Sequence, residues 1–341
     1  MPASALQEAV RRLARRESLS AAESAAAFRA VMAGDGTPVL VAALLAALRV
    51  KGETPAEIAG AALALREAMT VLDAPDADTL VDTCGTGGGA VGTFNISTAA
   101  ALVAAGAGAR VAKHGNRSFT TKCGSADVLE ALGVAIEIPV ERMAAVLDEA
   151  GIVFMFAPTM HPAMRHVGPV RRELGIETVM NLVGPLANPA RAGRQVVGVS
   201  DPARAELMAG ALATLGTVHA LVVHGEPGMD EISPMGRTAV IEIRGGAVTR
   251  WTIDPESFGL APATADELKG GGPAANAAVI LAVLNGQGTP GATAAVLLNA
   301  AAAIFVAGRA GTLEAALEAA RGAISTGKAL AALERLRHAS R

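Results

Sequence analysis

Residues Asp82 to Thr98 have the sequence DTCGTGGGAVGTFNIST. Four glycines fall within five residues, directly after an apolar run that predicts a strand. A strand, a glycine loop and a helix N-terminus form an anion cradle, because glycine exposes backbone N–H groups and the helix dipole favours negative charge. Asn95 or Ser97 is expected to cap the helix that follows. A lone glycine cluster also occurs in turns that bind nothing, so this stretch alone leaves both interpretations open.

Five short apolar runs alternate with helical stretches from about residue 79 onward, which predicts a mostly parallel, helix-covered sheet. The runs are TLVDTCG, ARVAKHG, IVFMFAP, RQVVGVS and HALVVHG. AVIEIRGGAVTRWTI predicts a hairpin across Gly245-Gly246. We therefore expect the α/β class, with a small helical domain in residues 1–72 and a larger α/β domain in 73–341 that ends in a helical tail. Helices from about 160–185 are expected to join the small domain.

The amino-acid composition of the chain bears on which kinds of molecule it can bind. The 29 basic residues nearly balance the 32 acidic ones, so nothing general predicts nucleic acid or an anionic membrane as partner. The two cysteines, Cys84 and Cys123, are too few for a disulfide framework. The N-terminal residues lack an apolar signal core, and we expect a cytoplasmic protein.

A dinucleotide fingerprint is an alternative for the glycine loop, because Gly85, Gly87 and Ala90 have its literal spacing. However, VGTF separates the loop from the helix, and no Asp or Glu occurs between Thr83 and Ala126 to hold a ribose hydroxyl. An NADP-binding oxidoreductase is therefore the less favoured alternative. The near P-loop GAISTGKA follows a helix and lacks the Ser or Thr after lysine, so it predicts a helix end.

The segment KHGNRSFTTKCGSAD is the second anion-binding candidate. Solvated basic loops are common, but here hydroxyls and glycines lie beside the first cradle, which favours a phosphate or pyrophosphate ligand. Its donors are Lys113, His114, Asn116, Arg117, Ser118, Thr120, Thr121 and Ser125.

Two further pairs carry charge. Arg171 and Arg172 point about 100° apart on a helix, so one can face a cleft and hold a carboxylate. The helix is expected to begin at Pro162 and to bend near Gly168-Pro169. Asp230 and Glu231 follow a strand, and adjacent oxygen ligands there suit Mg²⁺ shared with substrate phosphates. Surface acids and solvated arginines are the ordinary alternatives.

Together these motifs resemble the anthranilate phosphoribosyltransferase family of tryptophan biosynthesis. The resemblance covers nearly the whole chain and includes GTGG…TFNIST, KHGNRS…GSADVLEALG, FMFAPTMHPAMRHVGPVRRELGIET, NLVGPLANPA, VVHGEPGMDEIS and GGPAANAA. It implies a nucleoside phosphorylase-like fold, a homodimer formed through the helical part, and transfer of phosphoribose from 5-phosphoribosyl 1-diphosphate to anthranilate. It implies no nucleic-acid or membrane partner.

The resemblance also assigns residues. It implies that Mg²⁺ is held by Ser97, Asp230 and Glu231, and anthranilate by Gly85, Asn116 and Arg171. It further implies that 5-phosphoribosyl 1-diphosphate, the phosphoribosyl donor, is contacted by Gly85, Gly88, Gly89, Thr93, Asn95, Ile96, Ser97, Thr98, Lys113, His114, Gly115, Asn116, Arg117, Ser118, Phe119, Thr120, Thr121 and Ser125.

Two positions depart from the family pattern. Gly89 stands where an Asp often follows GTGG, and Met160-His161 stands where a histidine pair often precedes PAM. Neither removes a group that the chemistry requires. An aromatic amine needs no strong base, so no acid or base is assigned, and His114 is kept as the one candidate. The alternatives are an enzyme of this fold with another acceptor or with nucleoside phosphorolysis, and a catalytically silent relative that binds nucleic acid.

Overall fold

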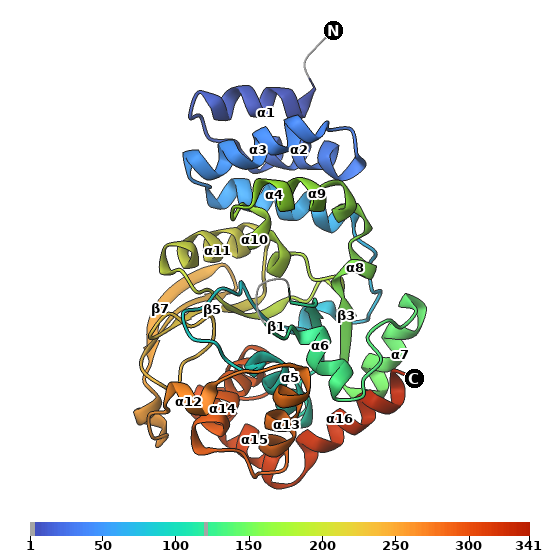
Figure 1. The fold of residues 1–341 in the computed structure, drawn as a ribbon. Helices are drawn as coiled ribbons and strands as arrows, with labels where there is room; N and C mark the ends of the chain where they lie inside the picture. The colour runs from blue at the N-terminus through green and yellow to red at the C-terminus, as the bar shows by residue number, and fades with distance from the viewer. Residues whose placement is uncertain (1–3, 119–121) are drawn as a thin grey trace.

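A seven-stranded sheet forms the centre of the computed structural model, which describes residues 4–118 and 122–341 (Figure 1). Its strand order is β3-β2-β1-β4-β5-β6-β7. The first five strands are parallel, and the last two add an antiparallel edge. The bounds are β1 (Val81–Gly85), β2 (Val111–Gly115), β3 (Ile152–Phe156), β4 (Arg194–Gly198), β5 (His219–Gly225), β6 (Thr238–Arg244) and β7 (Ala247–Ile253).

The strands are short apolar runs because helices cover both faces of the sheet. On β4, Val196 belongs to one apolar core and Val197 to the other, and Leu221 and Val222 alternate in the same way on β5. The β6–β7 turn has two glycines with positive φ, 55° at Gly245 and 83° at Gly246. The predicted fold class and hairpin are confirmed.

Four helices build the N-terminal layer at the top of Figure 1: α1 (Ala5–Ala14), α2 (Ala21–Ala33), α3 (Pro38–Lys51) and α4 (Pro55–Ala68). Ser20 with Glu23, and Thr54 with Glu57, form capping boxes that begin α2 and α4. α4 packs against α2 and against α11 (Pro202–Thr214) on the sheet. The N-terminal helices therefore share one apolar core with α11 and the face of the sheet that α11 covers.

The segment after β3 is broken into short pieces. They are α8 (Ala157–Met160), a 3₁₀ turn (Pro162–His166), α9 (Gly168–Leu174), α10 (Met180–Val183) and a second 3₁₀ turn (Gly184–Leu186). The predicted single bent helix is wrong in this detail. Pro169 lacks an N–H, which a helix tolerates in its first turn but not in its interior, so a new helix begins at Gly168 after the 3₁₀ turn ends at His166. α9 contacts α3, and α10 contacts α4.

Helices on the other face include the largely buried α14 (Pro290–Val306), which packs on α5 (Ile96–Gly106) and α15 (Leu313–Ser325). Asn299 on α14 is buried and exchanges two 2.9 Å hydrogen bonds with the backbone of Ile232. Among the described residues, no helix has both the length and the apolar character needed to cross a bilayer. The other elements are α6 (Ser125–Ala131), α7 (Val140–Ala150), α12 (Ala265–Leu268), α13 (Pro273–Leu284), α16 (Lys328–Ala339) and 3₁₀ turns (Ala77–Thr79, Pro255–Phe258).

Candidate active site

A cleft of about 740 Å³ lies where β1 and β2 end. In an open α/β sheet, ligands collect at these carboxyl ends, beside the strand at which the order reverses. Here that strand is β1, between β2 and β4. The cleft is lined by Cys84, Gly85, Thr86, Gly87, Asn95, Ser97, Thr98, Lys113, Gly115, Asn116, Arg117, Ser118, Gly124, Ser125, Gly168, Arg171, Arg172, Gly175, Ile176, Glu177, Asn181, Asp230 and Glu231.

The glycine loop faces the acid pair across this cleft. The Gly87 N–H donates to Asp230 Oδ2 at 2.7 Å, and the Ser97 N–H donates to Glu231 Oε1 at 3.2 Å. The backbone N–H groups of Gly87 and Ser97, which we expected to bind a ligand anion, therefore donate to carboxylates of the protein itself. The expected helix cap is partly wrong. Asn95 is the N-cap residue, but its side chain donates to the Cys123 carbonyl instead of capping α5.

The acid pair is the electrostatic centre of the cleft. Burial raises the pKa of Asp230, and burial followed by the Asp230 charge raises the pKa of Glu231 to about 8. Within the described residues, neither carboxylate has a salt-bridge partner, and no group of three or more His, Cys, Asp or Glu side chains is arranged for a metal. Two half-buried carboxylates that lack a salt-bridge partner in the described structure fit a hard cation that takes its remaining ligands from water or a phosphate.

Lys113 brings positive charge to the floor of the same cleft. Its side chain is buried, and Nζ donates to the carbonyl of Thr83, to Thr83 Oγ1 (3.2 Å) and to Ser97 Oγ (3.3 Å). Burial lowers the pKa of Lys113, and the Asp82 charge is the largest influence in the other direction. The predicted cation is therefore present, and neutral oxygens hold it.

The rest of the cationic loop is less positive than its sequence suggests. Arg117 pairs with Asp127 at 3.0 Å and with Glu130, and it stacks over Phe156 with 5.7 Å between guanidinium and ring centroid. Ser125 Oγ donates to the Asn116 carbonyl at 3.3 Å. The predicted residues Phe119, Thr120 and Thr121 lie outside the described residues.

A second, more apolar pocket of about 440 Å³ adjoins the cleft. Asn116, Gly168 and Arg171 line both cavities. Burial lowers the pKa of Arg171, whose guanidinium donates to Asn181 Oδ1 at 3.4 Å. The pocket is otherwise lined by Leu65, His114, Ala157, Pro158, His161, Pro162, Met164, Arg165, Met180 and Gly184.

Two histidine rings face each other in this pocket, with 4.9 Å between the centroids of His114 and His161. Burial, followed by the charges of His161 and Lys113, lowers the pKa of His114 to about 3. Burial lowers the pKa of His161 to about 4. Among the described residues, His114 Nε2 and both ring nitrogens of His161 are buried without a hydrogen-bond partner. Both rings are therefore neutral near pH 7 and are poor proton acceptors.

Some of the residues predicted to contact the phosphoribosyl donor do not line the cleft. They are Gly88, Gly89, Thr93, Ile96 and His114. The Ile96 side chain is fully buried in the core, and Thr93 forms an isolated bridge with Lys269. Conversely, sequence reasoning gave no role to Thr83, Asn181 or Asn188. Asn188 lies in NLVGPLANPA, a motif that pointed to the family without saying what the asparagine does.

Within the described residues, neither Cys84 nor Cys123 forms a disulfide. Burial raises the pKa of Cys84 well above its usual range, and that of Cys123 to about 11. Since the thiolate is the nucleophilic form, neither cysteine is set up for covalent chemistry.

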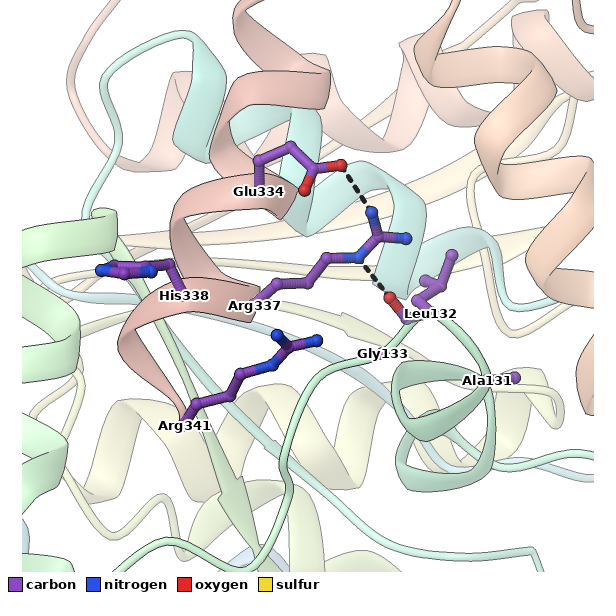
Figure 2. Close-up of a pocket in the computed structure, with 7 residues that line it drawn as sticks. All are labelled: Ala131, Leu132, Gly133, Glu334, Arg337, His338 and Arg341. Carbon is purple, nitrogen blue, oxygen red and sulfur yellow. Dashed lines mark hydrogen bonds and ion pairs between the residues drawn. The ribbon is translucent and has the colours of Figure 1, made fainter.

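A further cavity of about 440 Å³ lies away from the sheet edge, between the end of α6 and α16 (Figure 2). Arg337 donates to the Leu132 carbonyl and pairs with Glu334, while Arg341 extends beside it and His338 points away. No residue assigned to a substrate or metal by the sequence lines this cavity. The candidate active site is therefore the cleft with its adjoining pocket.

Two family models match the chain in consecutive parts. The glycosyl transferase family helical bundle domain matches residues 7–69, and the glycosyl transferase family a/b domain matches residues 77–330. The second match alone covers more than half of the chain.

Whole-chain relatives agree with this assignment. The chain is 52% identical to anthranilate phosphoribosyltransferase of Roseiflexus sp. over 98% of each protein. It is similar to the crystal structure of anthranilate phosphoribosyltransferase from Thermus thermophilus (TM-score 0.92, 45% identity, 98% of this chain and 99% of the other). It is also similar to the Saccharomyces cerevisiae enzyme in complex with PRPP and Mg (TM-score 0.89, 27% identity, 99% and 98% covered). The chain belongs to the anthranilate phosphoribosyltransferase family.

Proposed function

We propose that this chain transfers the phosphoribosyl group of 5-phosphoribosyl 1-diphosphate to the amine of anthranilate, in tryptophan biosynthesis. The products are N-(5-phosphoribosyl)anthranilate and diphosphate. The observation that carries the proposal is the junction of two cavities of different character at Asn116, Gly168 and Arg171. One cavity combines backbone donors, a lysine and an acid pair, and the other is apolar. A phosphorylated donor and an aromatic acceptor need such a pair of adjoining sites.

The donor belongs in the large cleft. Lys113 and Ser97 line it together with the glycine loop, and they supply an ammonium, a hydroxyl and backbone N–H groups for phosphate oxygens. Of the other residues predicted to contact the phosphoribosyl donor, those that line the cleft are Gly85, Asn95, Thr98, Gly115, Asn116, Arg117, Ser118 and Ser125.

Anthranilate belongs in the apolar pocket, with its carboxylate toward the junction. Arg171 is half-buried there and can hold a planar carboxylate through two parallel hydrogen bonds. Asn116 and the backbone of Gly85 complete the proposed acceptor contacts. His114 and His161 line the pocket with neutral rings, so they add no charge that would compete for the carboxylate.

Mg²⁺ is the proposed cofactor, and Ser97, Asp230 and Glu231 would hold it. Their hydroxyl and carboxylate oxygens are the ligand type that this ion prefers, and neither acid has a salt-bridge partner in the described structure. When bound, the ion supplies positive charge that neutralises the diphosphate.

Transfer breaks the bond between the anomeric carbon and diphosphate, forms the carbon–nitrogen bond and releases one proton from the amine. The ring oxygen stabilises the developing cation, so the main tasks of the protein are positioning and electrostatic stabilisation. Lys113 and the glycine-loop amides hold the leaving group, while Arg171 and Asn116 orient the amine. A neutral aromatic amine is already nucleophilic, and we assign no general base. His114, with its pKa near 3, is a weak base for that role.

We also propose that two copies associate through the helical layer. Val39 and Val50 on α3 are 77% and 81% exposed, and both lie on the side of the helix opposite its buried residues. A cytoplasmic location is also part of the proposal.

A fluorescence assay tests the proposed function. Purified chain is mixed with anthranilate, the donor and Mg²⁺, and anthranilate emission is followed. We expect a loss of emission that requires donor and is abolished by EDTA. Unchanged emission with folded protein would contradict the proposal, and nucleosides with phosphate would then test the phosphorolysis alternative.

A further inference from the structure

A buried carboxylate under the cleft has no part in the substrate contacts proposed above. Asp82 lies on β1 and is fully buried. Burying a carboxylate is costly unless hydrogen bonds and an opposite charge compensate for the lost water. The groups that compensate Asp82 indicate what it does.

The first group is the neighbouring strand. β1 pairs with β4 at five positions but with β2 at one, Val81 opposite Val111. Beyond that position, hydrogen bonds that involve side chains take the place of backbone hydrogen bonds between β1 and β2. The His114 N–H donates to Asp82 Oδ1 at 3.1 Å, and Asn188 Nδ2 donates to the Ala112 carbonyl at 2.8 Å. The two strands therefore separate as they enter the cleft, and polar side chains set their spacing.

Asn188 fixes the Asp82 carboxylate between β1 and β2. Its Nδ2 donates to Asp82 Oδ2 at 2.7 Å, and its Oδ1 accepts the Ala190 N–H at 2.9 Å. Asn188 is 1% exposed, so this network is closed to water. Both carboxylate oxygens have a fixed donor, which leaves Asp82 one orientation.

The second compensating group is Lys113, on the β2 side of the same gap. In the described structure its ammonium meets only neutral oxygens, those of Thr83 and Ser97, and has no direct salt bridge. The His114 N–H that Asp82 accepts is the backbone group directly after Lys113, so the carboxylate fixes the part of β2 that carries the ammonium.

We propose that Asp82 is a positioning residue for the donor site. Its carboxylate, fixed by Asn188 and bonded to the His114 N–H, holds the segment 113–116, and with it the Lys113 side chain, in the arrangement that receives diphosphate. This inference rests on the proposed function, because it assigns Asp82 to the donor half of that reaction.

The substitution Asp82→Asn tests the inference. Asparagine keeps an acceptor for the His114 N–H, but it removes the charge and places an amide N–H₂ against that of Asn188. We expect the KM for the donor to rise roughly tenfold, the size of one lost charge-assisted contact. The KM for anthranilate should change less than about twofold, because Arg171 is untouched. If Asp82 served only to stabilise the fold, the substitution would lower the fraction of protein that is folded and active, and it would leave both KM values unchanged.

The double substitution Asp82→Asn with Asn188→Asp restores one acid and one amide in the gap. The amide introduced on β1 would donate to the carboxylate introduced opposite it, and only the Ala112 carbonyl would lose its donor. We expect the double variant to recover the donor KM to within about threefold of the unaltered chain, as for a restored buried pair. A double variant as impaired as the single one would overturn the inference.

Gln195 offers a matched control, because it is buried and lies opposite Asp82 in the register with β4. Its Nε2 donates to the Pro185 carbonyl, away from Lys113. Gln195→Met should lower thermal stability while both KM values stay within about twofold. If Asp82→Asn and the double variant both fail to fold, Asp82 serves folding and the inference is wrong.

Calorimetric binding of Mg²⁺-diphosphate separates this inference from the proposed function. Binding needs no acceptor and no turnover, so it can be measured even if the unaltered chain fails to use anthranilate. Weaker binding by Asp82→Asn, with recovery in the double variant, supports the inference. Equal affinities in all three proteins would overturn it.

Discussion

At the scale of single residues, Arg171 carries the assignment of the acceptor. It lines both cavities, and its one hydrogen bond to a side chain in the described structure is a long one, to Asn181. Arg171→Ala should raise the KM for anthranilate roughly 10- to 100-fold, since a bidentate charged contact is lost. The KM for the donor should change less than about threefold. Steady-state kinetics with each substrate varied in turn provides the measurement.

Arg172 is the natural comparison for Arg171. It is exposed and lines the cleft but not the apolar pocket. Arg172→Ala should therefore affect the KM for anthranilate much less than Arg171→Ala does. Equal losses for both substrates in Arg171→Ala would count against the acceptor assignment.

The buried histidines make stability depend on pH. Their pKa values, about 3 for His114 and about 4 for His161, lie below the ordinary 6.5. The stability that they contribute is full above pH 6.5 and is lost as the pH falls toward the folded-state pKa, because the unfolded chain then binds more protons. We expect the free energy of unfolding to fall between about pH 6.5 and pH 4.

Urea unfolding at pH 7 and pH 5 checks this effect. In His161→Gln one titrating ring is gone, so the difference between the two pH values should shrink by on the order of 1.5 kcal/mol. Parallel pH dependence in the variant and the unaltered chain would show that His161 is not held neutral.

At the scale of elements, sequence patterns predict what depends on neighbours along the chain. Capping boxes at Ser20 and Thr54 mark two helix starts, and paired glycines mark the β6–β7 turn. The five parallel strands follow from short apolar runs that helices must cover. The sequence therefore predicted the α/β class from local patterns, whereas the family resemblance rested on longer motifs such as KHGNRS…GSADVLEALG.

The site was less predictable because its contacts join distant parts of the chain. Asp230 binds the glycine loop 143 positions away, and Asn188 reaches Asp82 across 106 positions. Arg117 contributes to a cationic motif in the sequence, yet Asp127 and Glu130 neutralise it in the structure. Local patterns also did not show that β1 and β2 separate, since that separation depends on one buried asparagine.

Close approach of β4 to the acid pair gives a prediction at this scale. A Cβ added at Gly198 would overlap the backbone carbonyl of Asp230, which cannot move without shifting the acid pair. Gly198→Ala should destabilise the chain by about 2 kcal/mol and abolish the transfer activity. Thermal unfolding and the fluorescence assay measure the two effects.

Gly322 is the control for this substitution. It lies inside α15, and a Cβ there meets nothing within 4 Å. Gly322→Ala should stabilise the chain by about 0.5 to 1 kcal/mol, because alanine favours the helix, and leave activity intact. Activity retained in Gly198→Ala would mean that the position of Asp230 is not critical.

At the scale of the whole molecule, two apolar cores lie on opposite faces of one sheet. One of them joins the N-terminal helices to Val167, Val170 and the α10 residues. The division into residues 1–72, with the elements of about 160–185, and residues 73–341 stays a prediction. Arg171 comes from the first of these groups and Lys113 from the second, so their relative placement sets the distance between acceptor and donor.

Self-association is the second prediction for the whole molecule. Introducing charge at the exposed valines of α3, with Val39→Glu and Val50→Glu together, should convert a dimer into monomers, because the charges cannot be desolvated in an interface. Light scattering after size-exclusion chromatography gives the mass. The circular dichroism spectrum should stay unchanged. A dimeric double variant would place the interface elsewhere.

The most direct test of the central claim is the stoichiometry of the reaction in the cleft. Purified chain with anthranilate, the donor and Mg²⁺ is sampled over time, and mass spectrometry follows the anthranilate adduct while a coupled assay follows diphosphate. We predict one phosphoribosylated anthranilate for each diphosphate released, with neither product formed when a substrate is omitted. Diphosphate released without the adduct, or no reaction by the folded chain, would contradict the claim that these two cavities join a donor to anthranilate.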